Sequence, residues 1–491
     1  MIPSVLRRFA AALLAAAALC QTSPAWSDEP LKPCRVAGVR NEVRCGVVSR
    51  PLNPAEPDGK KIDVHYMVVP AMARRKLPDP VFLLAGGPGQ SAIGASAQVM
   101  PLFTRLNNRR DIVFVDQRGT GDSAPLECVD VRHRPMAEQS DPERQLAELL
   151  QCRDKLRKLP HGDLRFYTTT VAMQDLDAVR RQLGVAQVNL VGASYGTRAA
   201  IEYMRQFPKQ VRRTVIDGVA PPDMVLPASF STDNQAAFDA VVAGCESEPL
   251  CAKAHPTLRA DWIALLASLP KPVTVPHPLT GRPDSFTLTR DMVLGAVRGP
   301  LYLPALASGL PHAISEAAQG RYEALVGLNS LFAARPGMSL ATGMHFSVVC
   351  AEDYPRMATV KDAPGRDFER TFSRLYERVC AEWPRGEVPA AFYTMTPAAS
   401  PTLLLSGSID PATPPRHAER AAKALGANAR HVVVPNIGHG VLSVPCMHDV
   451  LFRFIDAEDD AQALKVDAGC AKNMPRPPAY RPLELSTGSA R

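Results

Sequence analysis

Residues 188–200 read VNLVGASYGTRAA, an apolar run that passes through Gly-Ala-Ser-Tyr-Gly into a helix-forming run. Ser194 therefore stands between Gly192 and Gly196, where a predicted strand becomes a predicted helix. In a G-x-S-x-G turn the serine oxygen is exposed at a sharp corner, and glycines flank it because a β-carbon would clash there. The helix N-terminus that follows favours a developing negative charge. The bare pattern also occurs in ordinary turns, so the strand before it and the helix after it are what favour a nucleophile.

On both sides of this turn, short apolar runs alternate with segments that have helical spacing. Residues 170–183 carry apolar side chains at helical spacing, and residues 441–455 predict a closing helix. Short apolar strands that alternate with helices predict a mostly parallel sheet with helices on both faces, an α/β fold. The predicted strands are 62–69, 81–85, 111–115, 188–191, 211–216, 402–405 and 431–434.

The strand rhythm is lost between residues 221 and 400, where the sequence is helix-rich and punctuated by prolines. A stretch of about 180 residues is longer than any ordinary loop. We therefore predict one sheet domain built from residues 28–220 and 401–491, interrupted by a helical insertion at 221–400.

A serine nucleophile needs a base, and the base needs an orienting acid. In this architecture they follow in the order serine, acid, histidine, each after a later strand. Asp410 follows the predicted strand 402–405, and His439 follows the predicted strand 431–434. Both would lie at the carboxyl ends of strands, where open α/β sheets bind their ligands. The alternatives are an Asp-Pro turn and a turn histidine between glycines, but no other histidine has this placement.

The oxyanion of an acyl-transfer reaction needs backbone N–H groups as donors. The sequence predicts one from Tyr195, directly after the serine, and one from the GGPG loop at 86–89. Pro88 has no N–H, so Gly87 is the predicted donor, with Gly89 as the alternative. A phosphate or dinucleotide cradle is excluded here because neither glycine-rich fingerprint is in register.

The N-terminus has the features of an export signal. Arg7 and Arg8 precede the apolar stretch 9–19, and Ala25-Trp26-Ser27 fits a cleavage site. We predict a signal peptide at residues 1–27, a periplasmic or secreted mature protein, and no membrane anchor once the signal is removed. The apolar stretch is too short to span a bilayer comfortably.

The chain has 11 cysteines, and removing Cys20 with the signal leaves an even number. Lipidation of Cys20 is disfavoured because the bulky Leu19 precedes it. An oxidising compartment permits disulfides, and no Cys-x-x-Cys pair suggests a metal site. Although sequence alone does not prove connectivity, we predict five local bridges because short loops cost least to close. The pairs are Cys34 with Cys45, Cys128 with Cys152, Cys245 with Cys251, Cys350 with Cys380, and Cys446 with Cys470.

Composition and charge limit the kinds of molecule that the protein is expected to bind. The chain is 46% hydrophobic and 21% charged, which is ordinary for a globular protein. Its formal net charge is +7, or +5 without the two arginines of the signal, and the basic residues are scattered. We therefore expect no nucleic-acid partner and no metal or organic cofactor.

Five motifs together carry a resemblance to a known family. They are GGPGQS at 86–91, DQRGTGDS at 116–123, GASYGT at 192–197, DPATPP at 410–415 and GHG at 438–440. As a set they resemble the α/β-hydrolase serine peptidases of the prolyl aminopeptidase group, and most closely the secreted tripeptidyl aminopeptidases with their TAP-like C-terminal region. The resemblance implies a peptide substrate cut from a free N-terminus, and an insertion that serves as a lid.

Substrate binding leaves one point open in the sequence. An aminopeptidase must recognise a free ammonium group, and buried carboxylates do this best. Glu352 and Asp353 are candidates because VVCAEDYP is similar to lid segments of the group, although a structural or solvated role is an equal alternative. Asp116 and Arg118 are interpreted as braces of the sheet rim rather than as chemical groups.

The sequence thus predicts an exported serine hydrolase, most favourably an aminopeptidase with Ser194, His439 and Asp410 as its triad. One rival is an esterase or lipase, since the same triad cleaves esters. A second rival is an inactive binding module, against which the intact triad in its proper order argues.

Overall fold

The computed structural model describes residues 31–333 and 339–482. Its centre is a nine-stranded sheet in the order β1-β2-β3-β5-β4-β6-β7-β10-β11. β1, β2, β3 and β5 pair antiparallel with one another in turn, and from β5 to β11 every pairing is parallel. The strands are β1 (Leu31–Cys34), β2 (Val43–Pro51), β3 (Lys61–Val69), β4 (Val81–Leu84), β5 (Ile112–Val115), β6 (Val188–Ala193), β7 (Val211–Asp217), β10 (Thr402–Gly407) and β11 (Ala429–Val434).

Helices cover both faces of this sheet, which confirms the predicted fold class. On one face α5, α6 and α16 bury Leu176, Ala199 and Ala418 against the strands. On the other face α2 and α17 bury Ala92 and Phe454 in a second core. β4 and β5 are buried at every residue, as strands covered on both faces must be. These helices are α2 (Ala92–Val99), α5 (Thr169–Gln182), α6 (Tyr195–Gln206), α16 (Pro415–Leu425) and α17 (Pro445–Asp456).

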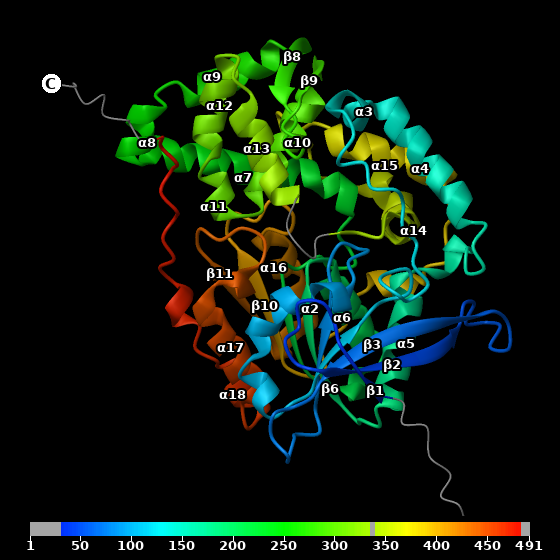
Figure 1. Ribbon diagram of the computed structural model, residues 1–491. Helices are drawn as coiled ribbons and strands as arrows, with labels where there is room; N and C mark the ends of the chain where they lie inside the picture. The colour runs from blue at the N-terminus through cyan, green and yellow to red at the C-terminus, as the bar shows by residue number, and fades with distance from the viewer. Residues whose placement is uncertain (1–30, 334–338, 483–491) are drawn as a thin grey trace, which may run out of the picture.

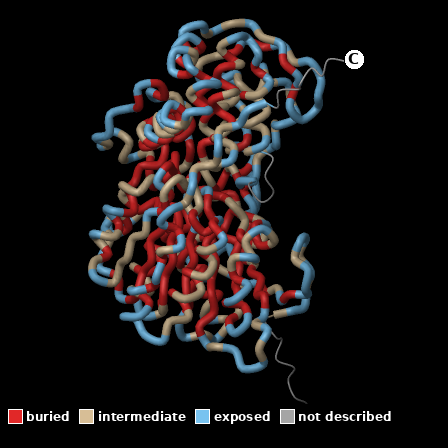
Figure 2. The backbone as a smooth tube through the Cα atoms, turned by 90° about the vertical axis from the view of Figure 1, so that its left-hand side faces the viewer, coloured by how far each residue is buried: buried red, intermediate tan, exposed pale blue. Residues whose placement is uncertain are grey.

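The chain between β7 and β10 forms a second layer at one end of the sheet domain (Figure 1). It has its own hydrophobic core, which includes Phe238, Trp262 and Phe368. Figure 2 shows buried stretches of chain in both layers. Its elements are α7 (Leu226–Ser247), α8 (Pro249–Ala254), α9 (Leu258–Ala267), β8 (Lys271–Pro276), β9 (Pro283–Leu288), α10 (Arg290–Leu301), α11 (Pro304–Ala307), α12 (Leu310–Ala318), α13 (Glu323–Ala333), α14 (Thr342–Glu352) and α15 (Thr371–Glu382).

This second layer differs from the predicted helical insertion in two ways. β8 and β9 form a hairpin that the sequence pattern did not indicate. α14 and α15 bury Phe346 and Val379 in the core of the sheet domain rather than in that of the insertion. In the other direction, α3 (Met136–Ser140), followed by α4 (Pro142–Leu156), reaches out of the first part of the sheet domain. There the Met136 amide donates to the Asp284 carboxylate on β9 over 2.7 Å.

The C-terminal segment returns to the insertion after α18 (Asp460–Leu464). Figure 1 shows it climbing from the sheet domain along the side of the molecule toward α8. The Arg476 guanidinium donates to the Ala240 carbonyl over 2.8 Å, and the Tyr480 amide donates to the Ser308 carbonyl over 2.9 Å. The two layers are thus joined by the C-terminal segment as well as by the chain on either side of the insertion.

Five disulfides brace the described part of the chain, and they join the pairs predicted from the sequence: Cys34–Cys45, Cys128–Cys152, Cys245–Cys251, Cys350–Cys380 and Cys446–Cys470. Within the described ranges, none of the helices has the length and apolar character needed to cross a membrane. The predicted signal peptide at 1–27 lies outside the described residues.

Candidate active site

Ser194 stands at the junction of β6 and α6 in a conformation that few side chains adopt. Its φ is 55° and its ψ is −124°, far from the ordinary regions for a residue with a β-carbon. The glycines on either side allow this turn. A β-carbon on Gly192 would lie 2.5 Å from the Gly196 carbonyl, and one on Gly196 would overlap the Leu84 carbonyl. The structure therefore gives the G-x-S-x-G motif the geometry of a nucleophile elbow, with Ser194 partly exposed.

His439 and Asp410 form a direct pair on the loops after β11 and β10. The His439 Nδ1 lies 2.8 Å from the Asp410 Oδ2. The second Asp410 oxygen accepts the amides of Ala412 and Thr413 over 2.8 and 2.9 Å. Burial acts to raise the pKa of Asp410, but the charge and hydrogen bond of His439 and these amides outweigh it and hold the pKa below its usual value. An ionised Asp410 keeps the proton of the neutral ring on Nδ1, so that Nε2 is the nitrogen suited to take a proton.

Ser194 and His439 are brought to the same place through the end of β7. The Ser194 amide donates to the Asp217 carbonyl over 2.9 Å. The next residue, Gly218, lies under the His439 ring, where a β-carbon would be 3.0 Å from Cε1. The sheet thus assembles the three predicted residues from the carboxyl ends of β6, β10 and β11, as parallel topology requires.

The predicted oxyanion donors flank the serine. Tyr195 is the first residue of α6, where an N–H group has no carbonyl partner within the helix. On the other side the loop after β4 touches the elbow, since a β-carbon on Gly86 would lie 3.2 Å from the Ser194 β-carbon. Gly87 and Gly89 both have positive φ, 112° and 107°, so this loop depends on glycine. The Gly87 amide thus belongs to a loop that lies against the nucleophile.

His345 on α14 supports that loop from the insertion. Its Nδ1 lies 3.0 Å from the Pro88 carbonyl and its Nε2 lies 2.8 Å from the Tyr376 hydroxyl. Burial lowers the pKa of His345, so the ring is neutral. Because a carbonyl can only accept, Nδ1 carries the proton and Nε2 accepts from Tyr376. Neutral His345 therefore supports the GGPG loop at 86–89, which carries the predicted oxyanion donor.

Tyr302, directly after α10, connects the insertion to His439. Its carbonyl accepts the His439 amide over 2.9 Å, and its ring meets the His439 ring edge to face at 5.2 Å. The Arg298 guanidinium donates to the Tyr302 hydroxyl over 3.2 Å and lies over the Phe230 ring. Among the described residues no carboxylate lies within 4.0 Å of Arg298. This side of the site therefore carries a positive charge that makes no direct ion pair with a carboxylate among the described residues.

Glu352 and Asp353, the candidates for binding an ammonium group, are buried and paired in the structure. Both side chains are 0% exposed, and both are paired with Arg198 of α6, over 3.4 and 3.0 Å to Nη1. The Thr169 amide also donates to Glu352, over 2.7 Å. Buried and held by these partners, the two carboxylates have the arrangement expected of the structural role, which the sequence left open as the alternative to ammonium binding.

The cluster of Arg198, Glu352 and Asp353 still bears on the site through its charge. Two acids face one guanidinium, and burial raises the pKa of Glu352 to about 7 despite the opposing effect of Arg198. The Thr169 hydroxyl bonds the Tyr195 hydroxyl over 2.6 Å, so Thr169 links the cluster to the residue after the nucleophile. When both acids are ionised, an excess negative charge lies beside Tyr195.

Asp217 is a further acidic group at the site that sequence reasoning missed. Its two carboxylate oxygens accept the amides of Val441 and Leu442 over 2.9 and 2.8 Å. Burial raises the pKa of Asp217 to about 6, against the opposing effects of these amides and of the His439 charge. Its position at the carboxyl end of β7, the strand next to the elbow strand, is the signal that could have revealed it.

The loop DQRGTGDS is scaffold in the structure. The Arg118 Nε donates to the Asp175 carboxylate over 2.6 Å, and its Nη1 donates to the Leu52 carbonyl over 2.9 Å. Asp116 accepts the Ser91 hydroxyl over 2.8 Å.

Among the described residues no group of three or more histidine, cysteine or acidic side chains is placed to hold a metal ion.

The comparisons with known proteins agree with this geometry. Residues 79–444 match the family model for the α/β-hydrolase fold. The chain is 25% identical to the serine protease Hip1 of Mycobacterium tuberculosis over 426 residues, 78% of this chain and 80% of that protein. It is 32% identical to a tripeptidyl aminopeptidase of Streptomyces lividans over 197 residues, 37% of this chain and 36% of that one. It is also 29% identical to a carboxylesterase B of Mycobacterium tuberculosis over 292 residues, 54% of each chain.

The family model covers most of the chain, Ser194 lies within the matched residues, and the relatives include a serine protease. The chain belongs to the α/β-hydrolase family and is a serine hydrolase.

Proposed function

We propose that this protein is an exported serine aminopeptidase that cleaves peptides from a free N-terminus. The observation that carries the proposal is the strained Ser194 at the elbow, together with the His439–Asp410 pair at the neighbouring strand ends. Export is supported by five disulfides and by the signal sequence predicted at residues 1–27.

In the proposed reaction, the Ser194 Oγ attacks the scissile carbonyl while the His439 Nε2 takes its proton. Asp410 holds the imidazole in the required tautomer and stabilises its charged form. The amides of Tyr195 and Gly87 bind the oxyanion that develops. His439 then gives its proton to the leaving amine, and the acyl-enzyme is hydrolysed by water through the same groups.

A peptide rather than an ester substrate is supported by two observations. Relatives named as a serine protease and as a tripeptidyl aminopeptidase match the chain. The excess negative charge of the cluster beside Tyr195 would attract a substrate ammonium through its field, even though the carboxylates do not touch it. An esterase is the second candidate, because a relative named carboxylesterase B also matches.

The test is the cleavage of aryl-amide peptides of one to four residues, each with a free and an acetylated N-terminus. The mature protein is compared with Ser194→Ala and with a control, Ser268→Ala, whose hydroxyl bonds the Leu265 carbonyl at the end of α9. We expect free-amine peptides to be cut, acetylated ones to be spared, and only the Ser194 variant to be inactive. Turnover of aryl esters without any peptide cleavage would replace the peptidase by an esterase. Failure of Ser194 to react with a fluorophosphonate would point to a binding module.

A further inference from the structure

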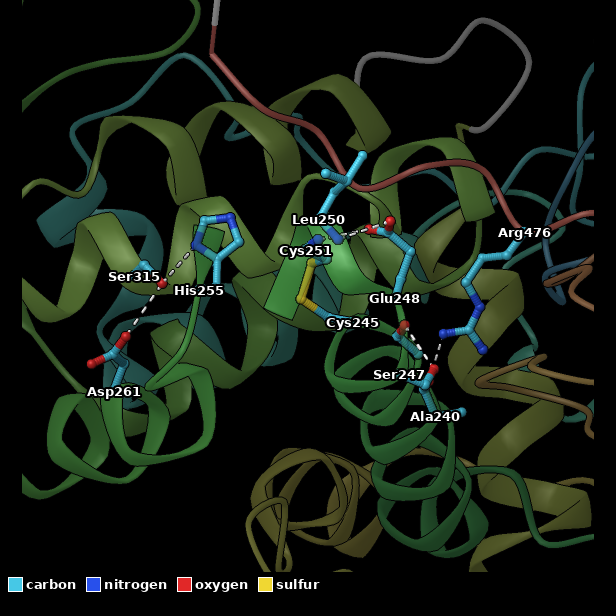
Figure 3. The surroundings of a disulfide bond; sticks show 11 residues. Ala240, Cys245, Ser247, Glu248, Leu250, Cys251, His255, Asp261, Ser315 and Arg476 are labelled. Carbon is cyan, nitrogen blue, oxygen red and sulfur yellow. Dashed lines mark hydrogen bonds between the residues drawn. A yellow bond between two sulfur atoms is a disulfide. The ribbon is translucent and has the colours of Figure 1, made fainter. Parts of the chain in front are cut away.

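A cavity of about 370 Å³ lies at the seam between the insertion and the sheet domain. Its walls come from four separate segments: α7–α8, α11–α12, the loops after β10 and β11, and the C-terminal segment. Figure 3 shows the side nearest the Cys245–Cys251 disulfide, with Arg476 reaching in from the C-terminal segment. We call it the seam pocket. Ser194, Gly87 and His439 do not line it.

The walls of the seam pocket are largely apolar. They include Val241, Pro304, Ala307, Pro311 and Ile409. The volume falls within the range of about 300 to 1,000 Å³ that is usual for sites that bind small molecules. A pocket of this size with apolar walls favours a ligand with a compact apolar body.

Arg476 supplies the polar feature that fixes the ligand's chemistry. Its guanidinium packs across α7 at Gly244, where a β-carbon would overlap Nη1. It donates to the Ala240 carbonyl over 2.8 Å. Among the described residues no carboxylate lies within 4.0 Å of it. Burial lowers the pKa of Arg476, as expected for a cation without a counter-charge.

Glu248 also lines the pocket, but its carboxylate already has partners. One oxygen accepts the Leu250 amide over 3.1 Å and the other accepts the Cys251 amide over 2.7 Å, which caps α8. Glu248 therefore stabilises a helix start instead of neutralising Arg476. The guanidinium retains N–H donors in a geometry that suits a carboxylate.

We propose that the seam pocket binds a small apolar carboxylate, with the carboxylate on Arg476 and the apolar body between α7 and Ile409. The same chemistry is offered by a medium-chain fatty acid and by the C-terminal end of a short apolar peptide. The proposal does not depend on the aminopeptidase activity, because the ligand site shares no residue with the triad.

The pocket is also placed to communicate with the catalytic loops. Ile409 directly precedes Asp410, and its amide donates to the Ile437 carbonyl over 3.1 Å, in the loop that carries His439. Asn436, from the same loop, lines the pocket and donates to the Met474 carbonyl over 2.7 Å. A bound ligand would therefore contact both loops from behind.

The test is calorimetric titration of the full mature chain carrying Ser194→Ala, so that no probe is turned over. The probes are decanoate, decanamide, acetyl-Leu-Leu with a free carboxylate and acetyl-Leu-Leu-amide. We expect at least one acid to bind and its amide to bind at least tenfold more weakly. Arg476→Gln should weaken the binding of that acid at least tenfold, whereas Lys472→Gln, an exposed cation of the same segment, should leave it unchanged.

A second variant separates loss of the site from loss of the fold. Gly244→Ala keeps the charge of Arg476 but displaces its guanidinium, and should also weaken binding. Circular dichroism and the melting temperature check that each variant is folded. Binding of only decanoate or only the peptide acid identifies the source of the ligand. Equal binding of acid and amide, unchanged binding by Arg476→Gln, or no binding of either acid up to millimolar concentration would overturn the proposal.

Discussion

Replacing Asp217 by asparagine should separate stability from activity at this site. In the native protein the carboxylate accepts the amides of Val441 and Leu442, just after His439, the proposed base. The asparagine side chain would keep the shape but offer one acceptor oxygen in place of two, and the substitution would remove a negative charge that acts on His439. The two consequences can be weighed against each other.

The effect on stability follows from the pKa. Burial raises the pKa of Asp217 from its ordinary value of 3.8 to about 6. Above about pH 6 the ionised group therefore costs roughly 3 kcal/mol relative to its neutral form. The lost amide hydrogen bond costs about 1 to 3 kcal/mol. These effects nearly cancel near neutral pH, so the melting temperature should change little. Since the native protein loses stability as the pH rises from about 4 to 6 and D217N does not, D217N should gain relative to it over that range.

The effect on catalysis has no such compensation. Losing one anchor lets the loop after His439 shift, and a displacement of about 1 Å can cost about 100-fold in rate. We expect kcat for an aryl ester or aryl amide to fall on the order of 10- to 100-fold, at a melting temperature close to that of the native protein. Asp223→Asn serves as the control, because Asp223 pairs with Arg420 over 3.0 Å at the surface. A kcat within about twofold of the native value, with a stability difference that does not vary with pH, would refute the reasoning.

Three further predictions concern the acid of the triad, the buried cluster and the elbow. Asp410→Asn should lower kcat about 10³- to 10⁴-fold with little change in KM, because an asparagine does not hold His439 in the required tautomer. Steady-state kinetics that show less than a tenfold loss of kcat would contradict that role. Glu352→Gln should gain stability relative to the native protein as the pH rises from about 5 to 8, on the order of 3 kcal/mol, since the pKa of Glu352 is raised from 4.5 to about 7. Denaturant unfolding of both proteins at about pH 5 and pH 8 measures this gain. A stability difference that does not change with pH would count against a buried titrating group. Gly196→Ala should abolish fluorophosphonate labelling and lower the melting temperature, because its β-carbon would overlap the Leu84 carbonyl. Gly327→Ala in α13 serves as the control and should keep the labelling, because its β-carbon would meet open space and its φ is not positive. A fully labelled Gly196→Ala would show that the elbow tolerates a side chain.

The sequence revealed those parts of the fold that local patterns encode. The predicted strands correspond to β3–β7, β10 and β11, because their apolar runs are short and end in glycine or turn residues. β1 and β2 were missed because polar residues and, in β2, a glycine interrupt their apolar pattern, and β1 is a short edge strand. β8 and β9 were missed because their alternation is weak and prolines occur in both strands.

The candidate site divides in the same way. Ser194, Asp410 and His439 each follow a recognisable strand, so their meeting follows from the parallel topology. Tyr302 and His345 reach the site from the insertion, and no local sequence pattern indicates where an insertion will contact the sheet domain. The sequence left the role of Glu352 and Asp353 open because Arg198, which pairs with both acids, lies more than 150 residues away in the chain.

The charges around the nucleophile form an asymmetric arrangement that bears on the orientation of a substrate. On the Tyr195 side, two carboxylates outnumber the single guanidinium of Arg198. On the Tyr302 side, Arg298 has no carboxylate within 4.0 Å among the described residues. Buried and half-buried charges act over longer distances than exposed ones because little water screens them. If the protein is the peptidase proposed above, this arrangement would favour a peptide that binds with its amine toward Tyr195 and its carboxylate toward Tyr302. An ester without charged ends would gain nothing from these charges, so they would support the proposed peptide substrate, although the triad itself serves both reactions.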